Sequence, residues 1–336
     1  MAASREVVLS IRNLSVEFKT DDGMLKAVDD LSYDLMAGET LGIVGESGSG
    51  KSVSSMAILG LLPKTAKISG EVLFRGESLL GRPEGELRRF RGNKIAMVFQ
   101  DALASLNPVM TVGKQIAEAI EVHDCAISST AARDRVVELL DIVGIPEPSR
   151  RINQYPHEFS GGMRQRAMIA MSIANEPDVL IADEPTTALD VTIQAQVMEV
   201  FERIQERTSS SLLLITHDLG VVAGVADRVM VMYAGRQVEI GSVDDVYYRT
   251  AHPYAQGLLA SLPRLDRRVP GERLHRIKGQ PPSLIFLPPG CAFNPRCPHA
   301  KPGICDTLRP EMQTVGFAHA SSCHFASELM TREVAS

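Results

Sequence analysis

The sequence is short of three features, and each shortage excludes a class of protein. It has no apolar run near the roughly 20 residues that span a bilayer, since stretches such as 211–215 have only the length of a strand. Its net charge of -6 offers no broad basic surface, so a nucleic-acid partner is not expected. Its five cysteines are too few for a disulfide scaffold in 336 residues. Hydrophobic residues at 44% and charged residues at 23% instead match an ordinary globular protein.

The start of the chain also lacks the long apolar segment of a signal peptide, and it carries Arg5 and Glu6. We therefore expect the chain in the cytoplasm. Its length allows one large domain with an appendage, or two modest domains.

The first part of the chain shows the apolar alternation of β-strands. Between Leu9 and Phe18 the phase slips near Asn13, which predicts a strand with a break or a bulge. A continuous apolar strand over residues 41–44 then runs into a glycine cluster. We expect an antiparallel β layer in this part of the chain.

The middle of the chain changes to helical spacing. Apolar residues recur on one face over residues 111–145, which predicts a helical insert, and we place this subdomain at about residues 101–175. Further strands, separated by helical stretches, are predicted at residues 179–182, 212–216 and 229–233. This alternation is typical of parallel strands covered by helices, so the expected fold class is α/β with a mixed sheet.

One segment has the pattern of a phosphate-binding loop (P-loop) between a predicted strand and a helical run. It comprises Gly45, Glu46, Ser47, Gly48, Ser49, Gly50, Lys51 and Ser52. In such a loop, backbone N–H groups and the helix N-terminus bind phosphate oxygens, Lys51 bridges phosphates, and Ser52 offers a hydroxyl to Mg²⁺. The alternative, a glycine-rich turn with an incidental lysine, is disfavoured by the strand and the helix on either side.

A pair of acids follows the predicted strand at residues 179–182. Asp183 and Glu184 stand at the end of that strand. Open α/β sheets bind ligands beyond the C-terminal ends of their parallel strands, so Asp183 can organise the Mg²⁺ shell and Glu184 can polarise the attacking water. Two solvated acids at a strand end are the alternative.

A third motif separates this chain from other P-loop proteins. Residues 155–166 read Tyr-Pro-His-Glu-Phe-Ser-Gly-Gly-Met-Arg-Gln-Arg. With this motif in place, the sequence closely resembles the nucleotide-binding subunits of ABC transporters over about residues 7–265. The resemblance implies an ABC cassette that hydrolyses ATP with Mg²⁺ and couples hydrolysis to transport.

The resemblance also implies roles for single residues. Gln100 matches the Q-loop glutamine that reaches Mg²⁺, Asp190 the D-loop, and His217 the switch histidine at the γ-phosphate. Phe18 stands where the family stacks an aromatic ring on adenine. Both rings have a structural alternative, because a lone histidine is usually structural and a strand phenylalanine is more often in the core.

The signature residues Ser160, Gly161 and Gly162 precede or begin a predicted helix, which makes an anion site with no lysine of its own. By the resemblance, two cassettes meet head to tail, and each signature contacts the nucleotide of the other. With Met163 in place, the motif Phe-Ser-Gly-Gly-Met-Arg-Gln-Arg resembles that of the D-type ATPases of oligopeptide and dipeptide importers, which pair with a non-identical ATPase.

That branch implies a set of partners and a location. The expected partners are a second, non-identical ABC ATPase, two integral membrane permease subunits and, indirectly, an extracytoplasmic solute-binding protein. The chain would lie peripherally on the cytoplasmic face of the membrane. Nickel and glutathione importers share the C-terminal extension and stay open as alternatives. A soluble ABC ATPase acting on DNA or ribosomes is a more distant one, disfavoured by the single cassette and the acidic balance.

Proline and glycine become dense after about Leu265, which predicts a main domain at 7–265 and a small Cys/Pro-rich extension at 266–336. The extension contains four of the five cysteines, Cys291, Cys297, Cys305 and Cys323. Four thiolates suit either zinc or an iron-sulfur cluster, their spacing excludes little, and four unrelated thiols are a third possibility.

Resemblance to cluster-bearing peptide-importer ATPases favours a 4Fe-4S cluster, with Arg296 offsetting its negative charge. Since the extension is far in sequence from every ATP motif, we expect a structural role for it. Cys125 stands alone, and we expect it to be an inert packed thiol.

Overall fold

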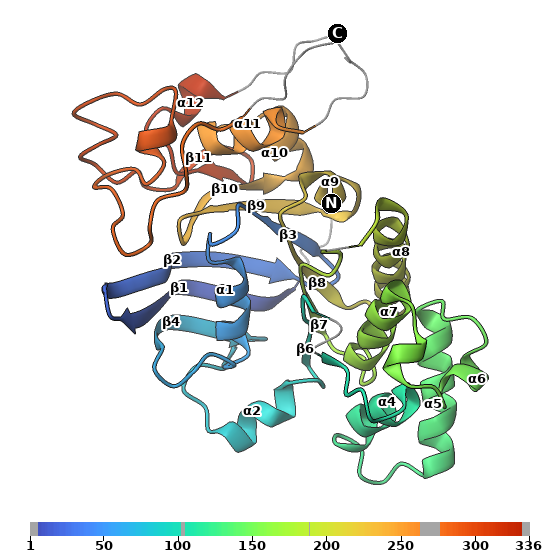
Figure 1. Cartoon of the computed structure of the whole chain (residues 1–336). Helices are drawn as coiled ribbons and strands as arrows, with labels where there is room; N and C mark the ends of the chain where they lie inside the picture. Colours follow the sequence, from blue (N-terminus) through green and yellow to red (C-terminus); the bar gives the residue numbers. More distant parts are fainter. Residues whose placement is uncertain (1–5, 102–104, 188, 263–275, 331–336) are drawn as a thin grey trace. The chain divides into compact units, whose positions relative to one another are not determined.

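The computed structural model of the chain describes residues 6–101, 105–187, 189–262 and 276–330 (Figure 1). The chain divides into two compact units, each made of three segments. The first unit comprises residues 1–10, 34–40 and 73–215. The second unit comprises residues 11–33, 41–72 and 216–336.

The first unit contains three parallel strands, β6 (Ile95–Val98), β7 (Val179–Asp183) and β8 (Ser211–Thr216), with β7 in the middle. Ile95 pairs with Val179, and Val179 pairs with Ser211. All residues of the three strands are buried, which explains why their sequences are apolar without alternation. The strands predicted at 179–182 and 212–216 are confirmed.

The helices of the first unit precede β6 or lie between the three strands in the sequence. They are α2 (Glu84–Phe90), α4 (Val112–Glu121), α5 (Ser129–Ile142), α6 (Pro148–Arg151), the 3-10 helix η1 (Pro156–Glu158), α7 (Gly161–Ser172) and α8 (Val191–Thr208). Helices α4, α5 and α7 contact one another, and α7 also contacts β6 and α8. The helical spacing over 111–145 thus corresponds to two helices, because the chain turns between α4 and α5 and Ser128 caps the second.

The second unit contains a mixed sheet in the order β3-β9-β10-β12-β11. Its strands are β3 (Thr40–Val44), β9 (Arg228–Tyr233), β10 (Arg236–Ser242), β11 (Gln313–Gly316) and β12 (His319–Ser321). Strands β3 and β9 are parallel, whereas the pairs β9–β10, β10–β12 and β11–β12 are antiparallel. The mixed sheet is confirmed, but the two strands of the extension, β11 and β12, were not predicted from its sequence.

The helices of this unit are α1 (Lys51–Ile58), α9 (Leu219–Val225), α10 (Val243–Tyr248), α11 (Pro253–Ala260), the 3-10 helix η2 (Asn294–Arg296) and α12 (Ala326–Leu329). The predicted boundary near Leu265 lies outside the described residues. The domain limits 7–265 and 266–336 and the helical subdomain at 101–175 therefore stay predictions.

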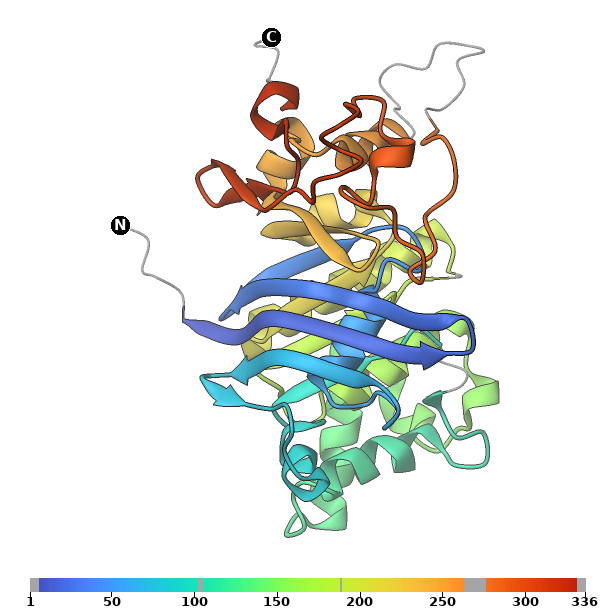
Figure 2. The same ribbon diagram turned by 90° about the vertical axis from the view of Figure 1, so that its left-hand side faces the viewer.

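A second sheet has the order β2-β1-β4-β5, and its three longer strands lie side by side in Figure 2. They are β1 (Val7–Thr20), β2 (Gly23–Met36) and β4 (Lys67–Phe74), and the short β5 is Glu77–Ser78. At the expected irregularity, Asn13 has a left-handed φ of 48°. Its N–H donates to Ser32 Oγ (2.8 Å) and its Nδ2 to Asp30 Oδ1 (2.7 Å), so β1 stays continuous through the slip.

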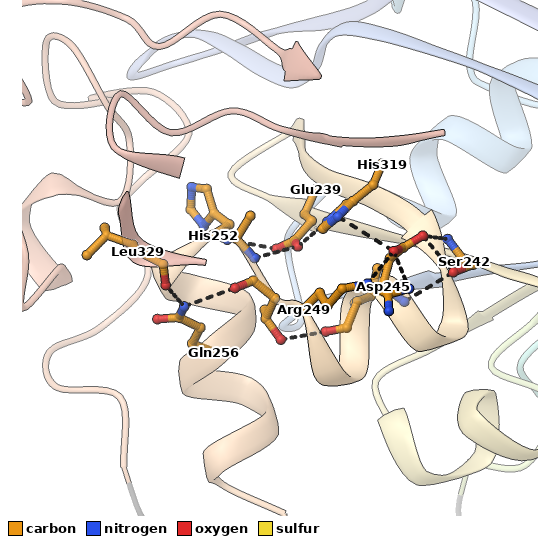
Figure 3. A network of polar contacts seen from close by, with 11 residues as sticks. Glu239, Ser242, Asp245, Arg249, His252, Gln256, His319 and Leu329 are labelled. Carbon is orange, nitrogen blue, oxygen red and sulfur yellow. Dashed lines mark hydrogen bonds and ion pairs between the residues drawn. The ribbon is translucent and has the colours of Figure 1, made fainter. Parts of the chain in front are cut away.

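A buried polar network joins β12 and α12 of the extension to β10 and α11 (Figure 3). Glu239 of β10 is fully buried and accepts the N–H groups of Ala251 (2.8 Å) and His252 (2.9 Å). Its Oε1 also lies 2.8 Å from His319 Nε2 on β12. Burial raises the pKa of Glu239, and burial lowers the pKa of His252 to about 3. Gln256 Nε2 donates to the Leu329 carbonyl (2.7 Å), which ties α11 to α12.

Candidate nucleotide-binding site

The phosphate loop, residues 45–52, links β3 to α1 through backbone that only glycine can provide. Gly50 has a φ of 96°, and a Cβ there would lie 2.3 Å from the Ala27 carbonyl oxygen. A Cβ on Gly45 would lie 2.3 Å from the Met232 carbonyl oxygen. The glycines therefore let the loop pass close to neighbouring backbone and turn into α1, whose N-terminal N–H groups favour an anion.

Lys51 holds its ammonium group inside this loop. Nζ donates to the carbonyl oxygens of Gly45 (2.7 Å) and Glu46 (3.0 Å), and the residue is 4% exposed. A positive charge thus lies at the N-terminus of α1. This charge and the helix dipole would both attract a phosphate group. Ser52 follows it in the first turn of α1.

Two residues far along the chain fix Glu46, and neither was predicted to do so. The Glu46 N–H donates to Tyr254 Oη (2.9 Å). Arg296 Nη1 donates to Glu46 Oε2 (2.7 Å) and Nη2 to Oε1 (3.0 Å). The guanidinium that was expected to offset a cluster charge therefore pairs with the phosphate loop instead.

In the first unit, the structure brings Gln100 and Glu184 together. Gln100 Nε2 donates to Glu184 Oε2 (2.9 Å), and so does Thr187 Oγ1 (2.9 Å). Glu184 has a left-handed φ of 48° and donates its N–H to the Ile215 carbonyl (2.8 Å), so the carboxylate is aimed by an uncommon backbone conformation. Asp183, one residue earlier at the end of β7, is 4% exposed. Thr187 was missed, although its place three residues after Glu184 is a local signal.

The signature loop, residues 160–162, also begins a helix of the first unit. Ser160 is the N-cap of α7, and its Oγ accepts the Met163 N–H (3.3 Å). A Cβ on Gly162 would lie 2.8 Å from Ile193 Cγ2, whereas a Cβ on Gly161 would meet nothing within 4 Å. Gly162 therefore permits the close approach of α7 to α8, and Gly161 leaves the helix N-terminus open.

The three remaining residues predicted to contact nucleotide are Asp190, His217 and Phe18. Asp190 caps α8, because its Oδ1 accepts the Ile193 N–H (3.0 Å), so it has a local structural role. His217 is exposed directly after β8. Phe18 is half-buried near the end of β1. Their contacts with nucleotide stay predictions.

The four cysteines of the extension line one cavity together with aromatic and histidine side chains. These neighbours include His252, Phe293, His299, His324 and Phe325. Burial raises the pKa values of Cys291 and Cys297, and burial raises that of Cys323 to about 11. Among the described residues, no group of three or more His, Cys, Asp or Glu side chains is arranged to hold a metal ion. Cys125 is exposed, so the expectation of a packed thiol was wrong.

Two known protein families match this chain, one in its cassette and one in its C-terminal region. The family model for the ABC transporter matches residues 28–187, and the model for the oligopeptide/dipeptide transporter C-terminal region matches residues 238–305. The chain is 52% identical over 320 residues to the dipeptide transport ATP-binding protein DppD of Bacillus subtilis, covering 95% of this chain and 94% of DppD. It is 52% identical over 324 residues to the oligopeptide transport ATP-binding protein OppD of Mycobacterium tuberculosis. That match covers 96% of this chain but only 52% of the longer relative.

Solved structures agree with this assignment. The dimeric structure of MJ0796, a bacterial ABC transporter cassette, superposes with a TM-score of 0.63 at 27% identity, covering 70% of this chain and 98% of that one. A post-hydrolysis structure of the same cassette contains ADP and Pi. The fold is thus the predicted ABC cassette of a P-loop NTPase. The chain belongs to the ABC transporter family, in its oligopeptide/dipeptide transporter branch.

No helix within the described ranges has the length and the apolar character needed to cross a membrane.

Proposed function

We propose that this chain is the ATP-hydrolysing subunit of a membrane importer and that it drives uptake of dipeptides or oligopeptides. The observation that carries the proposal is that a cassette and an oligopeptide/dipeptide C-terminal region occur in one chain, which matches a dipeptide transport ATP-binding protein almost end to end. The buried ammonium group of Lys51 within the phosphate loop supports the ATP part.

The predicted site residues bind the phosphates, activate the attacking water and contact the adenine. Lys51 and the N–H groups of the phosphate loop bind the β- and γ-phosphates. Glu184, oriented by Gln100 and Thr187, accepts a proton from the water that attacks the γ-phosphorus. His217 contacts the γ-phosphate, and Phe18 stacks on the adenine.

The residues also suit Mg²⁺. Bound Mg²⁺ would supply positive charge to offset that of the phosphate oxygens. The Ser52 hydroxyl, the Asp183 carboxylate and the Gln100 amide are hard oxygen donors of the kind that Mg²⁺ prefers, and we assign them to it.

The signature loop indicates that the chain works with a second ATPase. Ser160, Gly161 and Gly162 offer an open helix N-terminus without a lysine of their own, so we assign them, with Asp190, to the nucleotide of a second, non-identical ATPase. Two permease subunits and an extracytoplasmic solute-binding protein would complete the importer. The chain would then lie on the cytoplasmic face of the membrane.

Purification of the tagged chain from detergent-solubilised membranes tests this proposal. We expect one different ATPase and two integral membrane proteins to copurify, and we expect the vesicle-reconstituted complex to take up a labelled dipeptide with ATP. A complex carrying Glu184→Gln is the matched control and should not transport. Uptake of nickel or glutathione in place of peptides would contradict the solute assignment, and copurification with ribosomes or DNA alone would contradict transport.

For the extension, we propose that Cys291, Cys297, Cys305 and Cys323 bind a 4Fe-4S cluster. The four side chains line one cavity, yet no three of the described ligand-type side chains converge on a single metal position. Zinc needs all its sulfur donors at about 2.3 Å from one point. Thiolates of a cluster bind different irons, and four cysteines that line one cavity can supply such a set of ligands.

Anaerobic purification followed by iron, sulfide and zinc analysis tests the cluster. We expect iron and sulfide in near-equal amounts, lost in the Cys297→Ser and Cys305→Ser double variant and kept in Cys125→Ser. Stoichiometric zinc without iron, or metal kept in the double variant, would contradict it.

A further inference from the structure

The phosphate loop carries an acidic side chain that the roles above leave unused. Glu46 stands directly after Gly45, and its side chain is 26% exposed. A carboxylate beside bound phosphate repels it, and the repulsion grows where solvent is partly excluded. Unless its charge is compensated, Glu46 opposes the ligand that the loop is built to bind.

Arg296 supplies that compensation with its whole guanidinium group. Two parallel hydrogen bonds join it to both carboxylate oxygens of Glu46, at 2.7 and 3.0 Å. Its Nε donates to the Lys278 carbonyl (3.1 Å) and its Nη1 to Tyr233 Oη (3.3 Å). The Arg296 side chain is only 5% exposed, and its hydrogen bonds with Glu46 raise its pKa. Such a fork holds the carboxylate in one orientation.

The position of Arg296 links the loop to the cysteine cavity. Arg296 ends η2, which lies between Cys291 and Cys297. Phe293, directly before η2, packs against the rings of Tyr233 (5.2 Å between centroids) and Tyr254 (5.4 Å). Tyr254 in turn accepts the Glu46 N–H. Glu46 is therefore held at its backbone and at its carboxylate by one aromatic and cationic cluster that includes the extension.

We infer that Arg296 is a positioning residue for nucleotide binding: it neutralises and orients Glu46, and it thereby makes the C-terminal extension a determinant of ATP affinity. The inference rests on the proposed ATP binding by the phosphate loop. Because coupling between two sites is reciprocal, a change in the extension that displaces η2 lowers ATP affinity, and bound ATP stabilises the position of η2.

Titration of the full-length chain with a fluorescent ATP analogue tests the charge argument. We expect Arg296→Ala to weaken binding about 10-fold, because it leaves Glu46 uncompensated beside the phosphates. Adding Glu46→Gln to Arg296→Ala should restore most of the affinity, since the repulsive charge is then gone. Arg296→Lys keeps the charge but loses the fork, so we expect about a 3-fold loss. This milder variant carries the test if Arg296→Ala fails to fold.

Arg309→Ala is the matched control from the same extension. In the part of the chain that the structure describes, Arg309 pairs with Asp29 (3.4 Å) and Asp30 (3.7 Å) on β2 and not with the phosphate loop. We expect its affinity to stay within 2-fold of wild type. In the assembled complex, Arg296→Ala should raise the KM for ATP and leave kcat within about 2-fold, as expected for lost ground-state binding.

Two results would overturn the inference. One is a double variant as weak as Arg296→Ala alone, which would mean that lost structure and not charge explains the effect. The other is an equal loss in Arg309→Ala. Lys51→Ala separates this outcome from failure of the proposed function, because unchanged binding in that variant would show that the loop is not the nucleotide site.

Discussion

Two loops rich in serine and glycine begin helices in this chain, but different parts of the sequence support them. The phosphate loop contains its own cation, Lys51, and it is fixed by Tyr254 and Arg296, more than 200 residues away. The signature loop has no lysine, and it is supported locally, by its own cap Ser160 and by the close packing of Gly162. In the proposed function the first loop binds phosphate alone, whereas the second offers only a helix N-terminus.

The two units also differ in the charged side chain that each contributes to the proposed reaction. The unit with the phosphate loop holds the buried cation, and the unit with the signature loop holds the carboxylate of Glu184 with its two hydrogen-bond donors. Substitutions in the two units should therefore change different measured quantities.

The largest expected effect is that of Glu184→Gln. The amide cannot accept the proton of the attacking water, so we expect kcat to fall about 100- to 10,000-fold. Affinity for ATP should stay within about 3-fold, because the phosphate loop is unchanged. Steady-state phosphate release and equilibrium nucleotide binding measure the two quantities. Wild-type turnover would remove Glu184 from the mechanism.

Lys51→Ala should act on binding first and is the direct test of the two loops. We expect the isolated chain to bind ATP about 100-fold more weakly, because a charge-assisted contact to phosphate is lost. Ser160→Ala, the comparison variant, should keep the affinity of the isolated chain and lower hydrolysis only in the assembled complex. Equal loss of affinity in both isolated variants would contradict the distinction between a complete and an incomplete site.

Gly162→Ala tests the local support of the signature loop. The added methyl group would approach Ile193 Cγ2 at 2.8 Å, so we expect a loss of about 1–3 kcal/mol in the free energy of unfolding. Gly161→Ala is the matched control, since a Cβ there meets nothing within 4 Å. Urea unfolding of both variants measures the difference, and equal stabilities would mean that α7 and α8 shift apart at no cost.

The smallest expected effect is a pH dependence of the protein's stability, caused by the buried His252. Burial lowers the pKa of His252 to about 3, from an ordinary value near 6.5, so the unfolded chain binds a proton that the folded chain excludes. Stability from this residue is therefore present above pH 6.5 and is lost as the pH falls toward 3.

At pH 5.5 this loss amounts to about 1.4 kcal/mol relative to pH 7.5. Urea unfolding at both pH values measures it, with His252→Asn as the variant that lacks the titrating ring. We expect the variant to lose correspondingly less stability on acidification. The same acid sensitivity in the variant would assign it to other groups.

Sequence patterns predicted the parts of this protein that depend on neighbouring residues. Runs of fewer than ten consecutive residues carry the patterns of the phosphate loop, of the acids after β7 and of the buried parallel strands. Contacts between distant segments carry no such signal. Arg296 and Glu46 are 250 positions apart, and the sequence around either residue does not indicate that the two are in contact. Strand β12 has three residues, too few to show any period, so its pairing with β10 could not be predicted.

That short strand has a practical consequence for work on the extension. Strand β12 occupies the hydrogen-bonding edge of β10, and the four-residue β11, with an irregular register, then becomes the outermost strand of this sheet in the described residues. A chain shortened before residue 313 would leave the edge of β10 open, and open edges template aggregation. Insolubility of such a truncated protein would then report a bare sheet edge and not the loss of the cysteines. Single substitutions, which keep the hairpin in place, are the cleaner means of studying the cysteine cavity.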